Sequence, residues 1–439
     1  MKNILVLGAG MVAGPLVRYL LEQPENKVLV GSRTVEKAQK MVQGYANGSA
    51  LKILIDDEDV VSKAVADADI VISLLPWIHH LKVAKLCLKH GKHMVTTSYV
   101  KPEMKALDAD VKAKGLLFLN EIGVDPGIDH MAAMKIIDHI HANGGTVESF
   151  YSYCGGLPAL ASNTNPFGYK FSWSPDGVLL AAGNDGRYLK NGKVVEIPGE
   201  KLFEHYWLLD VPGAGVFEAY VNRDALPYMD IYGIPKVKSM YRGTLRNISH
   251  CEAWNYYKKI GMLNQKDVFD TGKMPPKAII AAMIGSKGTD IEAELASFLG
   301  IPGYSVAIKK LGWLGVLDDA PLNIGEVTPF ALFAHLMKKR LVYTKGETDL
   351  LVQQHEFIAV YPDRKEEVIS TLVNTGIPNG DSSMSRTVGL PAAIATDMLA
   401  KGKIDLAGVH IPVLSKVYTP VLEVLEKNGI YFEERVKTL

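Results

Sequence analysis

The sequence has few cysteines, no excess of charge of either sign and no long apolar run. Forty-eight basic residues balance 48 acidic ones, so no global field favours nucleic acid or an anionic membrane. The longest apolar stretches, such as 69–75, have the length of a strand and are too short to span a bilayer. Only three cysteines occur in 439 residues, without the spacing of metal ligands, which predicts a reducing compartment and no metal site: Cys87, Cys154 and Cys251.

The start of the chain adds a further expectation. Met1 to Asn3 lead directly into an apolar run, which leaves no room for a signal peptide. Together with the cysteine usage, this predicts a cytoplasmic protein. A chain of 439 residues is long enough for about two or three domains, each with its own core.

The most specific pattern lies in the first 34 residues. An apolar run at 4–7 is followed by a glycine turn, a helical pattern and a second apolar run at 28–30, which is a βαβ unit with a dinucleotide-binding fingerprint. Gly8 permits the tight turn, Gly10 lets the backbone approach a pyrophosphate, and Ala13 keeps the helix close to the sheet. The N-terminus of that helix offers free N–H groups and a positive dipole end to the pyrophosphate.

The end of the second strand favours NADP(H) over NAD(H). An NAD site usually has Asp or Glu there to bind the ribose 2′-hydroxyl, but this chain has Gly31-Ser32-Arg33-Thr34. An acid would repel a 2′-phosphate, whereas Ser32 and Arg33 are suited to bind one through charge-assisted hydrogen bonds. A glycine turn beside an exposed arginine is the alternative interpretation.

Strands at 51–55, 69–74, 93–96 and 116–120 alternate with helical patterns. This alternation predicts an α/β fold with an N-terminal doubly wound, Rossmann-type sheet over 1–123. Ligands bind beyond the carboxyl ends of such strands, which here are Leu75, 97–99 and 121–126.

The pattern changes after about residue 147. Alternating segments separated by Gly, Asn and Pro predict a mostly antiparallel sheet, and helical periodicity predicts an insertion over about 254–345. We therefore expect a mixed α/β domain over 124–387, with the segment from about 388 to 439 returning to the nucleotide domain. The expected strands of the second sheet are 148–154, 178–182, 193–197, 216–222 and 357–360.

Three residues near predicted strand ends are candidates for acid–base chemistry: Tyr99, Asp125 and Cys154. Asp125 is placed to bind an ammonium group or move a proton, or alternatively to cap the helix predicted at 128–137. Tyr99 is equally consistent with a packed aromatic, and Cys154 with a small buried hydrophobe. Neither 138–141 nor 79–80 predicts a metal site, because residues two apart on a helix diverge.

Two arginine segments, Asn222-Arg223-Asp224 and 241–246, are suited to carboxylates. Arginine binds a carboxylate in a planar, bidentate manner, and Thr244 adds a hydroxyl donor beside Arg246. A solvated surface charge remains the alternative for each arginine.

The chain also resembles a known family. It is similar to the glutamate-forming saccharopine dehydrogenases, also called saccharopine reductases, closely from residue 1 to about 260 and more loosely to the C-terminus. It resembles their free-standing form, since nothing corresponds to the lysine-ketoglutarate reductase of the bifunctional form. The motifs that carry the resemblance are GAGMVAGP, SLLPWIHH, TTSYV, GVDPGIDHM, SYCGGLPA, FSWSPDGVLLA, NRDALPY, YRGTLR, LGWLG and GLPAAIA.

The resemblance implies an activity and a set of site residues. These enzymes interconvert saccharopine with L-glutamate and α-aminoadipate-δ-semialdehyde, using NADP(H), and form homodimers through the substrate domain. The implied substrate contacts are Ser98, Tyr99, Asp125, Arg223, Thr244, Leu245 and Arg246. The implied nucleotide contacts, with the glycine turn, are Gly8, Gly10, Met11, Val12, Ala13, Ser32, Arg33, Thr34, Ile55, Asp56, Leu75, Thr97, Ser98, Val124, Asp125, Pro126 and Trp173.

Other activities remain open from the sequence. Carboxynorspermidine dehydrogenase resembles this family and also reduces an imine with NADP(H), but its substrate has one carboxylate, and two arginine segments fit a tricarboxylate better. A non-catalytic NADPH-binding protein is a further alternative. Lysine-forming saccharopine dehydrogenase is disfavoured, because its relatives have the nucleotide fingerprint in mid-chain. Met11 replaces a more usual aromatic residue, which changes packing rather than phosphate contact.

Overall fold

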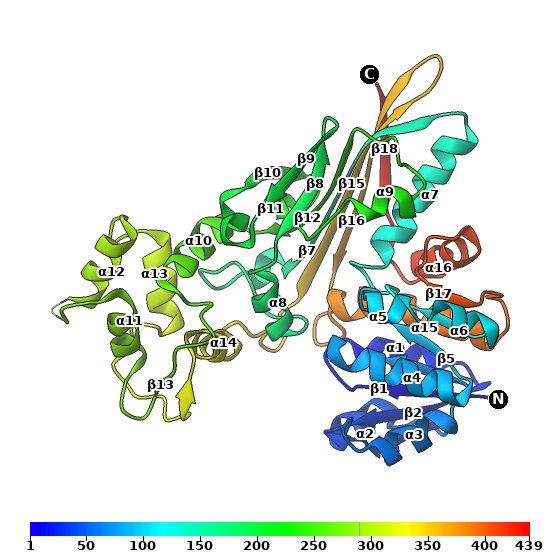
Figure 1. The fold of residues 1–439 in the computed structure, drawn as a ribbon, viewed down its shortest axis with the longest axis horizontal. Coiled ribbons are helices and arrows are strands. Elements are labelled where there is room, and N and C mark those ends of the chain that lie inside the picture. The colour runs from blue at the N-terminus through cyan, green and yellow to red at the C-terminus, as the bar shows by residue number, and fades with distance from the viewer. Residues whose placement is uncertain (289) are drawn as a thin grey trace.

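The computed structural model describes residues 1–288 and 290–439. Its N-terminal part is a seven-stranded parallel sheet in the order β17-β6-β5-β4-β1-β2-β3, at the lower right of Figure 1. Strands 3-2-1-4-5-6 in that order are the doubly wound arrangement, so the predicted Rossmann-type sheet is confirmed. The strands are β1 (Lys2–Leu7), β2 (Asn26–Ser32), β3 (Gly48–Lys52), β4 (Ile70–Ser73), β5 (His93–Thr96), β6 (Leu117–Leu119) and β17 (Gly408–His410).

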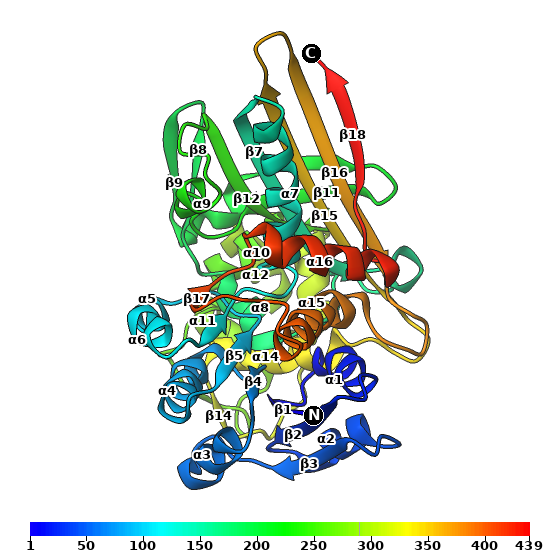
Figure 2. The same cartoon turned by 90° about the vertical axis from the view of Figure 1, so that its right-hand side faces the viewer.

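Helices flank this sheet on both faces (Figure 2), because each crossover between parallel strands passes through one. The first packs on the sheet through buried apolar residues of its inner face, among them Leu16 and Leu20. The helices are α1 (Ala13–Leu21), α2 (Val35–Val42), α3 (Glu58–Ala66), α4 (His80–His90), α5 (Pro102–Lys105) and α6 (Asp108–Ala113), with the 3₁₀ turn η1 (Trp77–His79).

The C-terminal segment returns to this sheet. β17 pairs with β6 in parallel, and α15 (Ser383–Ala400) packs against α1. Gly389 permits the close approach of the two helices, since a Cβ there would stand 2.8 Å from the carbonyl oxygen of Val12. The next helix, α16 (Ser415–Lys427), packs on both α15 and α7 (Ile128–Ala142).

The second sheet has nine strands and rises diagonally from the nucleotide-binding sheet in Figure 1. Its order is β10-β11-β12-β7-β15-β16-β18, with β8 and β9 attached beside β12. Strands β7 and β12 pair in parallel and the other pairs are antiparallel, so the sheet is mixed, as expected. The strands are β7 (Thr146–Pro158), β8 (Gly186–Lys190), β9 (Lys193–Ile197), β10 (Tyr206–Val211), β11 (Gly215–Val221), β12 (Ser239–Arg246), β15 (Asp349–Val360), β16 (Lys365–Thr375) and β18 (Glu433–Thr438).

One expected strand is wrong. Residues 178–181 belong to the helix α8 (Pro175–Ala181), and Ala182 is its C-cap. Ser174 caps this helix by accepting the N–H of Gly177 at 3.3 Å, and Pro175 occupies its first turn. A capping serine followed by proline is a helix start signal, and it outweighs the apolar alternation that suggested a strand.

The predicted helical insertion forms the left-hand lobe of Figure 1. Tyr257, Ile279, Leu311 and Phe333 are fully buried residues of this lobe. Its helices are α10 (His250–Ile260), α11 (Pro276–Ile284), α12 (Ile291–Leu299), α13 (Val306–Leu314) and α14 (Pro329–Arg340), with the short pair β13 (Phe269–Asp270) and β14 (Glu326–Val327). The remaining elements are α9 (Pro227–Ile231), η2 (Leu160–Ser162) and η3 (Gly199–Glu204). Among the helices of residues 1–288 and 290–439, none has the length and apolar character needed to cross a membrane.

Candidate active site

The glycine turn after β1 has the geometry of a pyrophosphate site. Gly8 has φ +114°, and a Cβ there would stand 3.0 Å from the carbonyl oxygen of Leu74, so only glycine fits. No heavy atom lies within 4 Å of the place where a Cβ of Gly10 would stand. At the next residue but one, Val12 precedes α1 without any side-chain cap. The first N–H groups of the helix are therefore free for an anion, and the turn fits a dinucleotide.

The end of β2 is consistent with a 2′-phosphate. The Ser32 hydroxyl accepts the Thr34 N–H at 3.2 Å, which bends the backbone around the position where the phosphate is expected. Arg33 is exposed and forms no ion pair with another described residue. The nucleotide-side predictions at Ile55, Asp56, Leu75 and Thr97 lie in the loops that follow β3, β4 and β5.

Asp125 is part of a buried ion cluster beyond the end of β6. Arg242 donates to its Oδ1 at 2.5 Å and to Oδ2 of Asp129 at 2.6 Å. The Tyr99 hydroxyl donates to the same Oδ1 of Asp125 at 3.2 Å. Burial raises the pKa of Asp125, and the positive charge of Arg242 opposes that rise.

The capping alternative for Asp125 does not apply. Helix α7 begins after Gly127 without a side-chain cap from that residue, and the Gly127 N–H donates to Oδ1 of Asp129 at 2.5 Å. Asp129 therefore binds the backbone at the start of α7, whereas Asp125 faces Tyr99 and Arg242 across the domain junction.

Tyr99 and Cys154 are both protonated in this environment. Burial raises the pKa of the Tyr99 phenol well above its usual value, and the Asp125 carboxylate adds to the rise. Burial likewise raises the pKa of the Cys154 thiol, so it is neither a thiolate nucleophile nor a base. The guanidinium of Arg223 lies over the Tyr99 ring at 5.2 Å from its centroid.

The remaining residues predicted to contact the substrate, Thr244, Leu245 and Arg246, lie on β12 of the second sheet. Side chains alternate along a strand, so Arg242, Thr244 and Arg246 of β12 share a face, and Thr244 is the register partner of Cys154 on β7. The intervening Leu245 has a fully buried side chain and points to the opposite face. Its carbonyl oxygen accepts Nη1 of Arg246 at 2.8 Å.

Arg246 is a buried cation that no acid among residues 1–288 and 290–439 neutralises. Its side chain is 8% exposed and lies over the Tyr169 ring, 5.1 Å from the centroid. Within the described residues it forms no ion pair, and its Nε has no hydrogen-bond partner. Since burying an unpaired charge is costly, this guanidinium is suited to an anionic group supplied from outside the chain.

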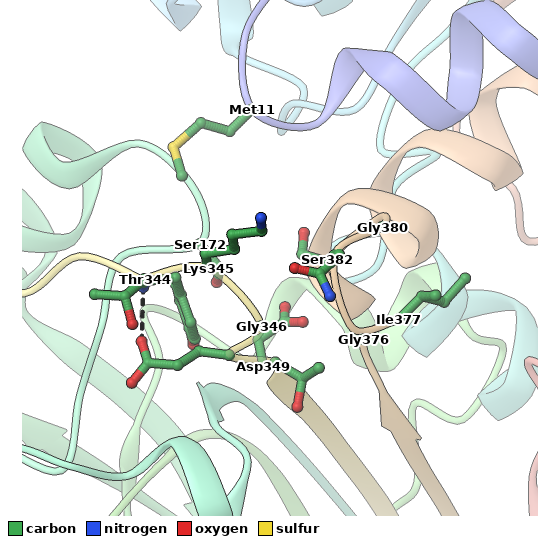
Figure 3. Close-up of a pocket in the computed structure, with 14 residues that line it drawn as sticks. Met11, Ser172, Thr344, Lys345, Gly346, Asp349, Gly376, Ile377, Gly380 and Ser382 are labelled. Carbon is green, nitrogen blue, oxygen red and sulfur yellow. Dashed lines mark hydrogen bonds between the residues drawn. The ribbon is translucent and has the colours of Figure 1, made fainter.

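A cleft separates the glycine turn from the second domain. It has a volume of about 490 Å³, and the Met11 side chain extends into it from the nucleotide-binding domain (Figure 3). The opposite wall includes Ser172, Thr344 and Asp349. Trp173 follows Ser172 on the same loop and is half-buried. At the start of α15, which borders this cleft, the backbone N–H groups already have an acceptor. The Asp349 carboxylate accepts the N–H groups of Ser383 and Met384 at 2.6 and 2.8 Å.

Four polar residues beside the predicted site were not predicted from the sequence. Arg242 lies in the motif YRGTLR, where nothing in the sequence distinguishes it from Arg246, and Asp129 and His130 lie in GVDPGIDHM. Glu121 has the backbone φ of +55°, accepts the Val100 N–H at 2.9 Å, and bonds Nε2 of His130 at 2.8 Å. All four side chains are polar and buried, and neither a helical nor a strand periodicity in the sequence marks a buried polar residue.

Two family models match the chain along almost its whole length. The saccharopine dehydrogenase NADP-binding domain matches residues 4–119, and the saccharopine dehydrogenase C-terminal domain matches residues 123–430. The chain belongs to the saccharopine dehydrogenase family. The predicted family is therefore confirmed, as is its NADP-type nucleotide domain.

Relatives and a solved structure agree with this membership. Saccharopine dehydrogenase [NADP(+), L-glutamate-forming] of Schizosaccharomyces pombe is 37% identical over 447 residues, which cover 99% of each chain. Mitochondrial α-aminoadipic semialdehyde synthase of Bos taurus is 37% identical over 98% of this chain but 47% of its own. The apo structure of saccharopine dehydrogenase (L-Glu forming) from Saccharomyces cerevisiae matches with a TM-score of 0.89 and 34% identity over 100% of both chains.

Proposed function

We propose that this protein is an NADP-dependent saccharopine dehydrogenase of the L-glutamate-forming type, acting on a C–N bond in lysine metabolism. The observation that carries the proposal is the buried, unneutralised Arg246 on the same sheet face as the Asp125–Arg242 cluster. Saccharopine has three carboxylates and two amines, so its recognition needs fixed cations and at least one acceptor. In this proposal, Arg223 and Arg246 bind carboxylates and Asp125 faces an amine.

Different residues of the site bind the substrate and orient its reacting carbon. Strand β12 and the loops after β5 and β6 fix the substrate from two domains, which holds the reacting carbon in one position and lowers the barrier through orientation. Asp125 is a candidate to exchange a proton with the secondary amine, because burial raises its pKa. Tyr99 and Cys154, both protonated, are candidates to donate hydrogen bonds. Held at the glycine turn, NADP⁺ would supply the acceptor for the hydride that leaves the carbon bound to the secondary amine.

The reaction on the substrate balances with NADP⁺ as hydride acceptor and one molecule of water. Loss of the hydride and of the amine proton converts the C–N single bond to an imine. Water then adds to the imine carbon, and cleavage releases L-glutamate and the aldehyde. In the reverse direction the imine forms from the two products and is reduced.

A spectrophotometric assay at 340 nm tests the proposal. We expect purified protein with L-saccharopine to reduce NADP⁺ well ahead of NAD⁺, with glutamate as product. Faster turnover of carboxynorspermidine than of saccharopine would overturn the substrate assignment. Tight NADPH binding without turnover of any imine would instead support a non-catalytic protein.

The proposal extends to a cytoplasmic homodimer. The three cysteines are buried and unpaired, which is consistent with a reducing compartment. Native mass spectrometry tests the oligomeric state, and fractionation of the source cells tests the location. A monomer, or recovery with an organelle, would contradict this part of the proposal.

A further inference from the structure

His80 lies at the start of α4, where it bridges two serines at the ends of neighbouring strands. Its Nδ1 is 2.9 Å from the Ser73 hydroxyl, at the end of β4, and its Nε2 is 2.8 Å from the Ser98 hydroxyl, just beyond β5. The imidazole is 6% exposed. Ser98 lies where the family resemblance places both ligands, whereas His80 belongs to none of the expected site residues.

The surrounding hydrogen bonds determine which nitrogen carries the proton. Thr96 donates its hydroxyl proton to the Ser73 carbonyl oxygen at 2.9 Å, so toward its other neighbours it only accepts. One neighbour is the Ser98 N–H at 3.4 Å and the other is Nε2 of His80 at 3.4 Å. A hydroxyl has one proton and two acceptor lone pairs. An Nε2–H of His80 shared between the Ser98 and Thr96 oxygens satisfies both contacts, so the geometry favours the tautomer in which Nε2 carries the proton and Nδ1 accepts from Ser73.

This tautomer sets the direction of the Ser98 hydroxyl. Since the Nε2–H of His80 donates to the Ser98 oxygen, the proton of that hydroxyl is left to point away from the imidazole. The relay therefore runs from Ser73 through His80 to Ser98 in one direction. Burial lowers the pKa of His80 to about 4, with a further contribution from His79, so the imidazole stays neutral and the direction does not reverse near neutral pH.

We propose that His80 is a positioning residue that fixes Ser98 as a hydrogen-bond donor to an acceptor oxygen of the bound ligands. The acceptor is either a substrate carboxylate or the carboxamide oxygen of the nicotinamide. The inference rests on the proposed function for its ligands, whereas the tautomer itself rests on the chain alone.

Nitrogen-15 NMR tests the tautomer without any activity. Two-bond ¹⁵N–¹H correlation spectra of histidine-labelled protein distinguish the two neutral tautomers, and loss of one of the 12 histidine patterns in H80Q or H80N assigns His80. We expect the Nε2–H tautomer from pH 7.5 down to about pH 5. An Nδ1–H tautomer, or an imidazolium at pH 7, would overturn the inference.

A pair of amide variants tests the role in turnover. The glutamine side chain of H80Q reaches about as far as Nε2 and keeps the contact with Ser98, whereas the shorter amide of H80N keeps only the contact with Ser73. We expect H80N to lower kcat/KM for saccharopine about ten- to a hundredfold and H80Q to recover most of that loss. H79N, at a half-buried neighbour outside the relay, serves as the matched control and keeps wild-type kcat/KM.

The kinetic pattern identifies the acceptor and separates the two proposals. A higher Kd for NADPH in H80N indicates the carboxamide, and a higher KM for saccharopine with unchanged NADPH affinity indicates a carboxylate. Equal losses in H80Q and H80N would overturn the positioning role. Absence of turnover in the wild-type protein would contradict the proposed function, and the NMR result would still decide the tautomer.

Discussion

Arg242 and Arg246 share one face of β12 but differ in what neutralises them. Arg242 is bound by Asp125 and Asp129, so removing it leaves the buried carboxylate of Asp125 without an ion-pair partner and that of Asp129 with only His130, 3.6 Å away. Arg246 has no acidic partner among the residues described, so removing it relieves a buried charge. The first arginine therefore stabilises the fold, whereas the second is the one that we propose to bind a substrate carboxylate.

Methionine variants are expected to separate these roles. R242M should lower the free energy of unfolding by about 3–5 kcal/mol. R246M should leave that free energy unchanged or higher, while raising KM for saccharopine about ten- to a hundredfold. Urea denaturation followed by circular dichroism, together with steady-state kinetics, measures both. R364M, in the exposed turn between β15 and β16, is the control, and loss of stability in R246M without a change in KM would contradict the assignment.

Glu121 is expected to hold the loop that carries Tyr99. Its Oε1 accepts the Val100 N–H at 2.9 Å, and its Oε2 bonds His130 at 2.8 Å and the Tyr228 hydroxyl at 3.3 Å. In E121Q the amide nitrogen takes the place of one acceptor oxygen and faces donors, which should cost about 1.5–3 kcal/mol of stability. Thermal unfolding and the KM for saccharopine both report this change. The conservative variant E121D shortens the reach but keeps the charge, and equal behaviour of wild type and E121Q would show that the loop is held by other contacts.

At the scale of elements, we expect the end of β2 to determine the preference for NADP over NAD. Ser32 ends the strand and Arg33 follows it, where NAD-binding relatives of the fold place an acid. We expect S32D to repel a 2′-phosphate and to lower kcat/KM for NADP⁺ about ten- to a hundredfold, while NAD⁺ gains in relative terms. S32A, which removes the hydroxyl without adding charge, is the control. An unchanged ratio between the two cofactors would place the 2′-phosphate elsewhere.

The elements also show what the sequence determines. The strands of the nucleotide domain follow from continuous apolar runs such as 70–73, because a parallel sheet buries both faces of its strands. The segment 178–182 alternates like a strand, but the capping Ser174 and the following Pro175 start a helix there. The parallel pairing of β7 with β12 depends on contacts between distant segments, which no local pattern encodes.

The site was predictable in part for a related reason. Gly8, Asp125 and Arg246 lie in motifs with a recognisable chemistry. By contrast, Glu121 and His130 bond each other, and His80 bonds the hydroxyls of Ser73 and Ser98. These buried contacts appear only when β4, β5, β6 and α7 are assembled. The same holds for Arg242 on the mixed sheet, because its partners Asp125 and Asp129 are far from it in sequence and only the fold brings them together.

At the scale of the whole molecule, the acid sensitivity of the fold follows from its buried titratable groups. Burial lowers the pKa of both His80 and His355 to about 4, whereas an exposed histidine titrates near about 6.5. Glu347 contributes below this range: burial raises its pKa, but hydrogen bonds from Lys170 and the Thr344 N–H lower it to about 2. Asp125 acts in the opposite direction, because burial raises its pKa.

The direction of each pKa shift determines how the free energy of unfolding depends on pH. Between about pH 6.5 and pH 4 the unfolded chain binds protons at these histidines that the folded protein does not, so stability falls as the pH falls. Each histidine contributes up to about 3 kcal/mol over this range. Between about pH 4.5 and pH 2 the unfolded chain likewise binds a proton at Glu347 before the folded protein does, and stability falls further.

His355 offers the sharpest test of this curve. Its ring is fully buried among Phe150, Phe357 and Phe432, so phenylalanine should fit its place. We expect H355F to flatten the dependence of the free energy of unfolding on pH between about 6.5 and 4, because one group no longer takes up a proton on unfolding. Urea denaturation at pH 7.5, 6.5, 5.5 and 4.5 measures the slope, with H139N, at an exposed position on α7, as the control. A slope equal to that of the wild type would mean that His355 accepts a proton inside the folded protein, where the charge of Asp129 raises its pKa against the effect of burial.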